Sequence, residues 1–279
     1  MAISAPEREF DFTRRDFDRV RELIFNRVGI TLHDSKHHMV YSRLARRLRA
    51  LNIDKFNDYL ELLNTNHGPE WEHFVNALTT NLTSFFREAH HFEELHQQLK
   101  NWEEASPTIW CSASSTGEEP YSIAITACEA FNKIPAPVHI IASDVDTNVL
   151  AKAQSGVYGL DRVEGLKQTQ LRSFFMRGTG QQEGLARVRA EVRNMIAFRQ
   201  LNLLEDDWAI RGGLAAIFCR NVMIYFDKPT QKKIIERFVP LLHPKGLLYV
   251  GHSESLHQAS EWLEPIGRTV YRLKNKRPK

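Results

Sequence analysis

The 279-residue chain has few cysteines, no long apolar run and almost no net charge. Its three cysteines, Cys111, Cys128 and Cys219, form no CxxC pair, which excludes a disulfide scaffold and a zinc ribbon. No apolar run approaches the roughly 20 residues that a membrane-spanning helix needs. The 37 Lys and Arg exceed the 34 Asp and Glu only slightly, too little for a dedicated nucleic-acid-binding protein. We therefore expect a cytoplasmic protein with no nucleic-acid partner and no direct membrane insertion.

The residues that are present are typical of a folded protein: 42% are hydrophobic, 10% aromatic and 25% charged. The length is about twice the common domain size of ~100 to 150 residues, so two packed units are expected. Residues 1–80 have helical periodicity. Thr13 and Asp16 form a helix-capping pattern, and Leu44, Leu48 and Leu51 share one helical face. An all-helical N-terminal domain is predicted there, followed by a connector at 81–95.

Residues 96–279 alternate short apolar strands with helical segments. Strands are expected at 108–112, 138–143, 215–219 and 246–251, and helices at 119–131, 147–153 and 229–242. Nearly continuous apolar strands separated by helices predict a doubly wound parallel α/β sheet. An insert at about 158–200 should be antiparallel, because Val188, Ala190 and Val192 alternate with charged residues after a glycine-bearing turn.

Three polar segments follow predicted strands: CSASSTGEEPYS (111–122), ASDVD (142–146) and FCRNVMIYF (218–226). Ligands of doubly wound sheets bind beyond the carboxyl ends of the strands, so these segments should form one site. Asp144, after the second strand, can accept both hydroxyls of a ribose. Each feature alone also has an ordinary explanation, because the Ser/Gly segment is more often only a turn and Asp146 is equally a helix cap.

These segments, together with NLTSFFRE (81–88), NLLE (202–205) and the run that continues from FCRNVMIYF to GHSE (251–254), resemble the CheR family of bacterial chemotaxis receptor methyltransferases. The resemblance runs from about residue 10 to 273. It implies a small all-α domain and a class I S-adenosylmethionine-dependent methyltransferase domain with an inserted β-subdomain. It also implies the reaction: a methyl group passes from S-adenosylmethionine to glutamates of chemoreceptor cytoplasmic domains, giving methyl esters and S-adenosylhomocysteine, by a monomer without a metal.

The resemblance further implies nine cofactor-contacting positions. They are Asn81, Thr83, Arg87, Glu118, Asp144, Asn202, Leu203, Arg220 and Asn221. Asp144 suits the ribose, Glu118 the methionine amino group or the sulfonium side, and Arg87 either the cofactor carboxylate or the incoming glutamate. Tyr225 is expected at the transfer site, where it shapes the pocket or hydrogen-bonds the glutamate, unless it is a core aromatic. Arg87 and Tyr225 are thus the catalytic candidates.

Two surfaces are expected to bind the receptor. The first is the segment 36–52, which has no acidic residue and contains Arg43, Arg46, Arg47 and Arg49. It could dock an acidic rod, although a solvated helix face is the ordinary explanation. The second is the insert, with Gly178, Gly180, Gly184 and Arg187. Family members that bind a C-terminal pentapeptide tail of the receptor keep a glycine-containing loop here, and the strand 185–198 should offer an exposed edge.

Two other functions compete with this interpretation. The first is amino-group methylation of DNA or RNA, because residues 220–226 loosely resemble an N/D-P-P-Y/F motif, although the prolines are missing. The second is a catalytically silent sensor of S-adenosylmethionine or a receptor scaffold, against which the intact Arg87, Glu118, Asp144 and Tyr225 argue. The 12 histidines show no HExxH or tetrahedral spacing, so no metal is expected.

Overall fold

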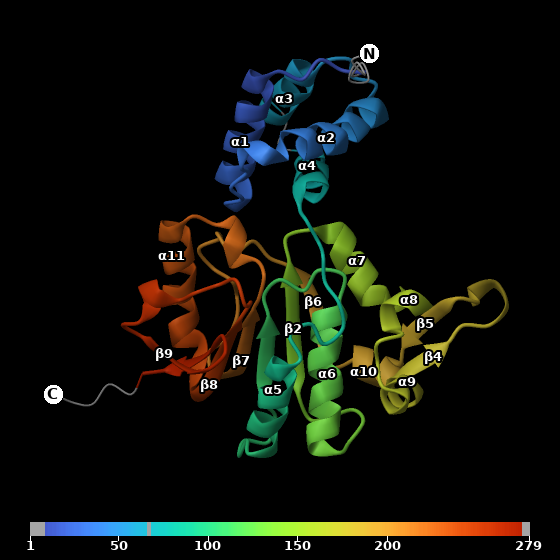
Figure 1. Cartoon of the computed structure of the whole chain (residues 1–279), viewed down its shortest axis with the longest axis vertical. Coiled ribbons are helices and arrows are strands. Elements are labelled where there is room, and N and C mark those ends of the chain that lie inside the picture. Colours follow the sequence, from blue (N-terminus) through green and yellow to red (C-terminus); the bar gives the residue numbers. More distant parts are fainter. Residues whose placement is uncertain (1–8, 66–67, 275–279) are drawn as a thin grey trace, which may run out of the picture. The chain divides into compact units, whose positions relative to one another are not determined.

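The computed structural model describes residues 9–65 and 68–274, and the chain divides into two compact units, Met1–Thr80 and Asn81–Lys279 (Figure 1). The first unit is helical, as predicted. It contains α1 (Arg14–Val28), η1 (Asp34–Lys36), α2 (His37–Leu51), α3 (Phe56–Thr65) and α4 (Glu70–Leu78). None of the helices in the described ranges is long and apolar enough to cross a bilayer.

The predicted capping pattern starts α1. The Thr13 hydroxyl accepts a hydrogen bond from the Asp16 amide, and the Asp16 carboxylate accepts one from the Thr13 amide. In α2, Leu44 and Leu48 are buried, whereas Leu51 is 36% exposed. Leu51 lies at the end of this shared face, because α2 ends at this residue and Asn52 turns the chain into the left-handed region.

The second unit is built on a seven-stranded sheet in the order β6-β2-β1-β7-β8-β10-β9. Its elements outside the insert are α5 (His90–Lys100), β1 (Thr108–Cys111), α6 (Glu118–Phe131), β2 (His139–Asp144), α7 (Thr147–Ser155), β6 (Ile196–Gln200), β7 (Leu214–Cys219), η3 (Met223–Tyr225), α11 (Lys228–Phe238), η4 (Val239–Leu241), β8 (Leu242–Val250), η5 (His257–Ala259), β9 (Leu263–Gly267) and β10 (Val270–Leu273). The neighbours from β6 to β8 pair in parallel, and β10 is antiparallel to β8 and β9. The predicted doubly wound fold is confirmed.

Side chains of the central strands alternate between two cores. Ile109 of β1 and Phe218 of β7 point into the core that α5 and α6 cover. Trp110 and Ile217, their chain neighbours, point into the core that α11 covers. Figure 1 shows α5 and α6 side by side over one face of the sheet. Burial on both faces explains why these strands read as continuous apolar runs.

The insert forms a separate antiparallel sheet in the order β3-β5-β4. Its elements are β3 (Val157–Gly159), α8 (Leu160–Val163), α9 (Gln168–Phe174), β4 (Phe175–Arg177), η2 (Gly180–Gln182), β5 (Leu185–Val188) and α10 (Ala190–Arg193). The prediction of one strand over 185–198 was wrong, because the run breaks into a helical turn at Ala190 and then joins the main sheet as β6. β5 is also the middle strand, so the exposed edges belong to β3 and β4.

Candidate active site

The strand order of the main sheet reverses between β1 and β7. From β1 the chain passes through α6 to β2 on one side, and from β7 it passes through α11 to β8 on the other. The carboxyl ends of β1, β2, β6 and β7 carry residues 112–117, Asp144, Asn202 and Asn221. Such a reversal leaves a crevice at this edge, which is where these folds bind ligands. The sheet therefore brings the separately predicted polar segments to one site.

Asp144 is the last residue of β2 and is only 8% exposed. Its Oδ2 accepts a hydrogen bond from the Ser115 amide at 2.8 Å, and its Oδ1 accepts one from the Asp146 amide at 3.0 Å. Burial raises the pKa of Asp144 to about 6, although these two amides act in the opposite direction. A carboxylate has about four acceptor positions in all, so hydroxyl donors of a ligand can be accepted besides these amides.

Asp146, in contrast, is the N-cap of α7. Its Oδ1 accepts hydrogen bonds from the amides of Asn148 and Val149, and its Oδ2 accepts one from the Asn81 side-chain amide at 2.8 Å. The helix-cap interpretation of Asp146 is therefore confirmed. Through this bond Asp146 also fixes the start of the connector beside β2.

The turn between β1 and α6 has two left-handed residues, Ser115 (φ 46°) and Gly117 (φ 99°). A Cβ atom at Gly117 would lie 2.6 Å from the Tyr158 hydroxyl, so a side chain there would displace this tyrosine. The same hydroxyl donates a hydrogen bond to the Thr116 carbonyl at 2.8 Å. Glycine is thus required here both by backbone conformation and by close packing.

Glu118, the first residue of α6, is fully buried. Its Oε2 accepts a hydrogen bond from the Thr116 hydroxyl at 2.6 Å, and its Oε1 forms an ion pair with Arg162 of α8. Arg162 also donates to the Thr83 carbonyl at 2.7 Å. Sequence reasoning missed Arg162, because no motif marks it and its partner lies 44 residues away.

Arg87 lies between two residues in the left-handed region, Phe86 (φ 51°) and Glu88 (φ 58°). Such conformations cost about 1 kcal/mol or more each and persist where the surroundings impose them. Here the Phe86 amide donates to the Ser122 hydroxyl at 2.9 Å, and Arg87 Nη1 donates to the Leu82 carbonyl at 3.0 Å. A guanidinium has five N–H donors, so Arg87 can still bind a carboxylate.

Arg220, directly after β7, has a side chain that is 1% exposed. It forms ion pairs with Glu119 and, at 3.5 Å, with Glu88, and it donates to the carbonyl of Arg87. It also lies over the Phe92 ring. Its charge is therefore neutralised within the protein, and the side chain connects α6, the connector and β7.

Glu254 is a site residue that the sequence analysis did not single out. Its buried carboxylate accepts hydrogen bonds from the amides of Asn221 at 2.9 Å, Met223 at 2.8 Å, and Gly251. Asn221 is left-handed (φ 58°), so Glu254 holds the turn that leads to Tyr225, which is half-buried. The only available signal was its place after a predicted strand, within GHSE.

Asn202 and Leu203 follow β6. The Leu201 amide donates to the Asp144 carbonyl at 3.0 Å, which places this turn beside the end of β2. The Asn202 side-chain oxygen accepts a hydrogen bond from the Leu204 amide at 3.0 Å, and Leu203 is buried. These residues therefore lie next to Asp144.

Two family models match almost the whole chain. "CheR methyltransferase, all-alpha domain" matches residues 15–79, and "CheR methyltransferase, SAM binding domain" matches residues 81–272. The chain belongs to the CheR methyltransferase family. It is an S-adenosylmethionine-dependent methyltransferase of the chemotaxis type, as the sequence motifs predict.

Relatives of this CheR-family enzyme are similar over nearly their full length. "Chemotaxis protein methyltransferase 2" of Pseudomonas aeruginosa is 53% identical over 267 residues, 94% of each chain. "Chemotaxis protein methyltransferase" of Salmonella typhimurium is 52% identical and covers 92% of this chain and 89% of its own. The Escherichia coli protein of the same name is 50% identical and covers 92% and 90%.

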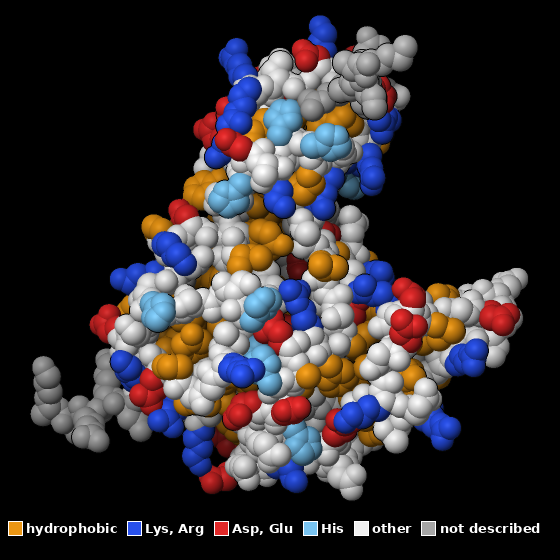
Figure 2. Space-filling view, viewed as in Figure 1, with side chains coloured by type: hydrophobic (Ala, Val, Ile, Leu, Met, Phe, Trp, Pro, Cys, Tyr) orange, Lys and Arg blue, Asp and Glu red, His pale blue; other side chains and the backbone are white. Residues whose placement is uncertain are grey.

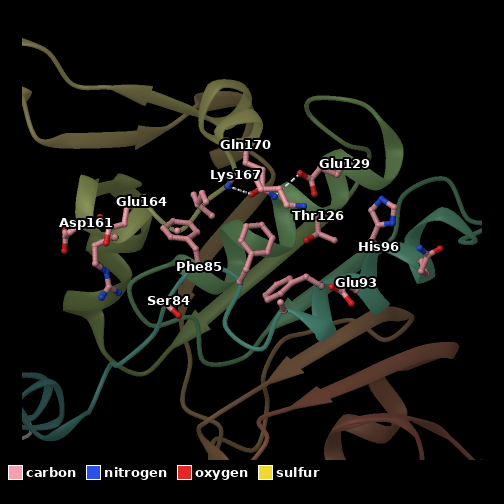
Figure 3. A pocket seen from close by; sticks show the side chains of 17 residues that line it. Ser84, Phe85, Glu93, His96, Thr126, Glu129, Asp161, Glu164, Lys167 and Gln170 are labelled. Carbon is pink, nitrogen blue, oxygen red and sulfur yellow. Dashed lines mark hydrogen bonds between the residues drawn. The ribbon is translucent and has the colours of Figure 1, made fainter.

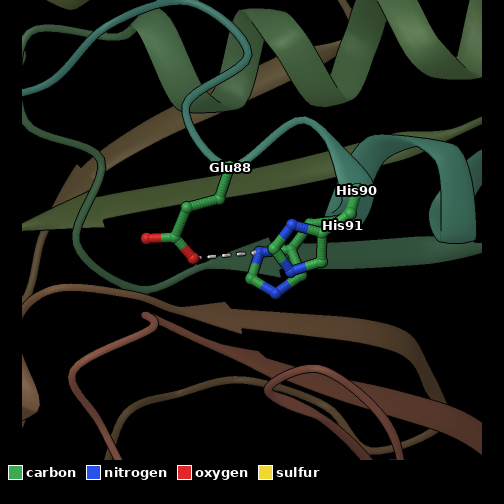
Figure 4. Close-up of side chains that lie close together, drawn as sticks. All are labelled: Glu88, His90 and His91. Carbon is green, nitrogen blue, oxygen red and sulfur yellow. Dashed lines mark ion pairs between the residues drawn. The ribbon is translucent and has the colours of Figure 1, made fainter.

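Glu88, His90 and His91 form a cluster at the end of the connector of this CheR-family enzyme (Figure 4). The His91 Nδ1 and Glu88 Oε2 atoms are 3.7 Å apart, and Arg220 lies 3.5 Å from the same carboxylate oxygen. Burial, with the Arg220 charge beside it, lowers the pKa of His91 to about 3, so its imidazole is neutral. Because Arg220 already supplies a cation to Glu88, the cluster is better suited to an ion-pair network than to a metal.

A hollow of about 740 Å³ lies between the connector, α5, α6 and the α8–α9 region (Figure 3). Its lining contains none of the nine predicted cofactor positions. Three of the lining residues are hydrogen-bonded to one another. The Gln170 side chain donates to Glu129 at 3.0 Å and accepts a hydrogen bond from the Lys167 amide at 3.2 Å. The hollow therefore does not include the predicted positions, although Arg162, which pairs with Glu118, lines it.

The four arginines predicted to dock the receptor differ in their surroundings. Arg43 donates to carbonyls at the end of α4, Arg47 forms a two-bond ion pair with Glu70, and Arg49 pairs with Glu9. Arg46 is exposed and has no ion-pair partner among the described residues. Figure 2 shows basic and acidic side chains mixed on the visible face of this helical unit. Arg46 is thus the one of the four that combines exposure with no ion pair among the described residues.

Proposed function

We propose that this enzyme methylates glutamate side chains in the cytoplasmic domains of chemoreceptors. It produces glutamate methyl esters and S-adenosylhomocysteine for adaptation in chemotaxis, and it acts in the cytoplasm as a monomer without a metal. The observation that carries the proposal is the CheR family match over residues 15–79 and 81–272, together with Asp144, Glu118 and Arg87 around one strand-order reversal.

The acceptor determines what the residues of the site must do. When bound, S-adenosylmethionine supplies a methyl group that a carboxylate oxygen can attack: the C–O bond forms, the S–C bond breaks, and sulfur keeps the electron pair. A glutamate has an ordinary pKa of ~4.3, so it is ionised at neutral pH and needs no general base. Base catalysis contributes only ~10² to 10⁴ in rate, whereas in-line placement contributes about 7 to 11 kcal/mol. Positioning therefore dominates.

Each side chain of the proposed site is assigned to one part of the cofactor or the acceptor. We assign Asp144 to the ribose, Glu118 to the methionine end of the cofactor, and Arg87 to a carboxylate. The connector that carries Arg87 is held in place by Arg220. Tyr225, on the turn held by Glu254, shapes the acceptor pocket.

The proposal is tested with S-adenosylmethionine carrying a tritiated methyl group and, separately, receptor-rich membranes, DNA or RNA. We expect label on the receptor that alkali releases as methanol, as a carboxyl methyl ester does. Alkali-stable label on nucleic acid would favour the amino-group methyltransferase. Cofactor binding without transfer to any acceptor would favour the silent sensor or scaffold.

Receptor docking through α2 is tested by Arg46→Glu. Reversing one exposed charge should lower receptor methylation about two- to fivefold at low salt, and the difference should shrink at high salt through screening. Affinity for S-adenosylhomocysteine should not change. Arg15→Glu, at an exposed arginine of α1, makes the same charge change and is the control. Equal losses in both variants would indicate a general charge effect and contradict docking at Arg46.

Tail capture by the insert is also proposed. β4 is one of the two edge strands of the insert; its Met176 lies opposite Arg187 of β5, and both side chains are exposed. Gly180 and Gly184 are left-handed, and Gly178 packs against the backbone of Gln182, so this turn is suited to glycine. An added strand on β4 would bring an acidic tail near Arg187. A flexible tether of this kind raises the local enzyme concentration to the millimolar range.

A peptide ending in an aromatic and acidic pentapeptide should therefore bind the wild type, and Arg187→Glu should weaken this binding about tenfold. Titration calorimetry with saturating S-adenosylhomocysteine measures both affinities. Arg172→Glu, at an exposed arginine of α9, is the control charge reversal within the insert. Absence of wild-type binding, or equal binding by wild type and Arg187→Glu, would reject tail capture and leave the methyltransferase assignment intact.

A further inference from the structure

Two polar side chains of the insert form hydrogen bonds with the segments around the cofactor site. Arg162 of α8 forms an ion pair with Glu118 and donates to the Thr83 carbonyl, and Tyr158 of β3 donates to the Thr116 carbonyl. Thr83 lies on the connector, whereas Thr116 and Glu118 lie at the start of α6. The insert therefore touches both of these segments.

The electrostatics of Glu118 make one of these contacts important. Glu118 is fully buried, so its carboxylate has lost its hydration, and a buried charge is strongly unfavourable without a partner of opposite sign. Of its two described side-chain partners, the Thr116 hydroxyl is neutral and Arg162 is the cation. The Arg162 side chain is itself 35% exposed, so the arginine keeps part of its own hydration.

The two hydrogen bonds of Arg162 also have a geometric effect. Both are made by Nη2, one to Glu118 Oε1 and one to the Thr83 carbonyl. A single guanidinium nitrogen therefore joins the connector to the start of α6. Because the insert supplies this group, it adds a second link between the connector and α6 to the direct one that the Phe86 amide makes with the Ser122 hydroxyl.

We propose that Arg162 is a positioning residue for the cofactor: it orients the Glu118 carboxylate and holds the connector at Thr83. This inference rests on the proposed cofactor site. The insert then has a second task besides tail capture, because it completes the support of the methyltransferase site.

The test measures S-adenosylhomocysteine affinity by titration calorimetry for the wild type, Arg162→Met, Glu118→Gln and the double variant. We expect Arg162→Met to weaken binding about tenfold or more, since it removes a hydrogen-bonded charge pair. In the Glu118→Gln background, Arg162→Met should add little, within about twofold, because its main partner is already changed. Arg162→Lys should restore much of the affinity, since it keeps a cation near Glu118.

The control is Arg172→Met, an exposed arginine of α9 in the same insert, which should bind as the wild type does. Thermal unfolding of each ligand-free variant separates folding defects from binding defects, and Arg162→Gln replaces Arg162→Met if the latter does not fold. Unchanged affinity in the folded variant would overturn the proposal. So would losses that multiply in the double variant, or an Arg162→Lys variant no better than Arg162→Met. A wild type that does not bind S-adenosylhomocysteine would instead refute the cofactor site itself.

Discussion

Replacing Arg87 by alanine should lower methyl transfer about a hundredfold or more, the range seen when one preorganised charge-stabilising donor is removed from an active site. The loss of stability should be small, because the described side-chain contact of Arg87 is a single hydrogen bond to the Leu82 carbonyl, worth about 1 kcal/mol. Initial rates with receptor and the unfolding temperature measure the two effects. Arg189→Ala, which likewise removes one hydrogen bond to a carbonyl, is the matched control.

The same variant separates the two roles proposed for Arg87. If the guanidinium binds the cofactor carboxylate, the affinity for S-adenosylhomocysteine falls together with the rate. If it orients the incoming glutamate, that affinity is kept and only turnover falls. Methylation at the wild-type rate would show that Arg87 has neither role.

Replacing Asp144 by alanine should weaken S-adenosylhomocysteine binding by about 1 to 3 kcal/mol, since the variant loses two charge-assisted hydrogen bonds to the ribose. Calorimetry measures this loss in the folded variant. Asp227→Asn, at the carboxylate that caps α11, is the control because asparagine preserves a helix cap. Wild-type affinity in Asp144→Ala would remove Asp144 from the cofactor site.

The binding of the cofactor should also depend on pH through Asp144. Its pKa in the ligand-free protein is raised from 3.8 to about 6, and the ionised form is the better acceptor for hydroxyl donors. Affinity should therefore be constant above about pH 7 and fall as the pH drops through 6, with proton release on binding in that range. The stability of the ligand-free protein changes with pH in the opposite direction to cofactor affinity. Because the pKa of Asp144 is raised by folding, its ionisation lowers the free energy of unfolding as the pH rises from about 4 to 6. Asp144→Asn should abolish both dependences, and an unchanged pH profile in that variant would contradict the assignment.

Much of the fold could be read from local pattern. The apolar runs that become β1, β2, β7 and β8 are buried on both faces of the sheet, and this burial is what makes them continuous. The Thr13 capping pattern is equally local, because its two partners are three residues apart. The insert could be predicted only as antiparallel, since alternation at Val188 and Val192 does not reveal that the chain turns between them into another sheet.

The candidate site likewise has features that the sequence predicts and contacts that only the folded chain shows. By itself the sequence determined that this is a two-part chain of the CheR type, with Asp144, Glu118 and Arg87 on segments that follow or precede strands, because motif residues and strand ends are local features. Only the tertiary structure decided which partners the charged side chains find. Arg162 meets Glu118 across 44 residues of sequence, and Arg220 meets Glu119 across 101. The Glu254 carboxylate meets the Asn221 amide across 33 residues. Ion pairs and backbone hydrogen bonds across such separations arise from the order of the strands and from packing around them, and no local periodicity encodes them.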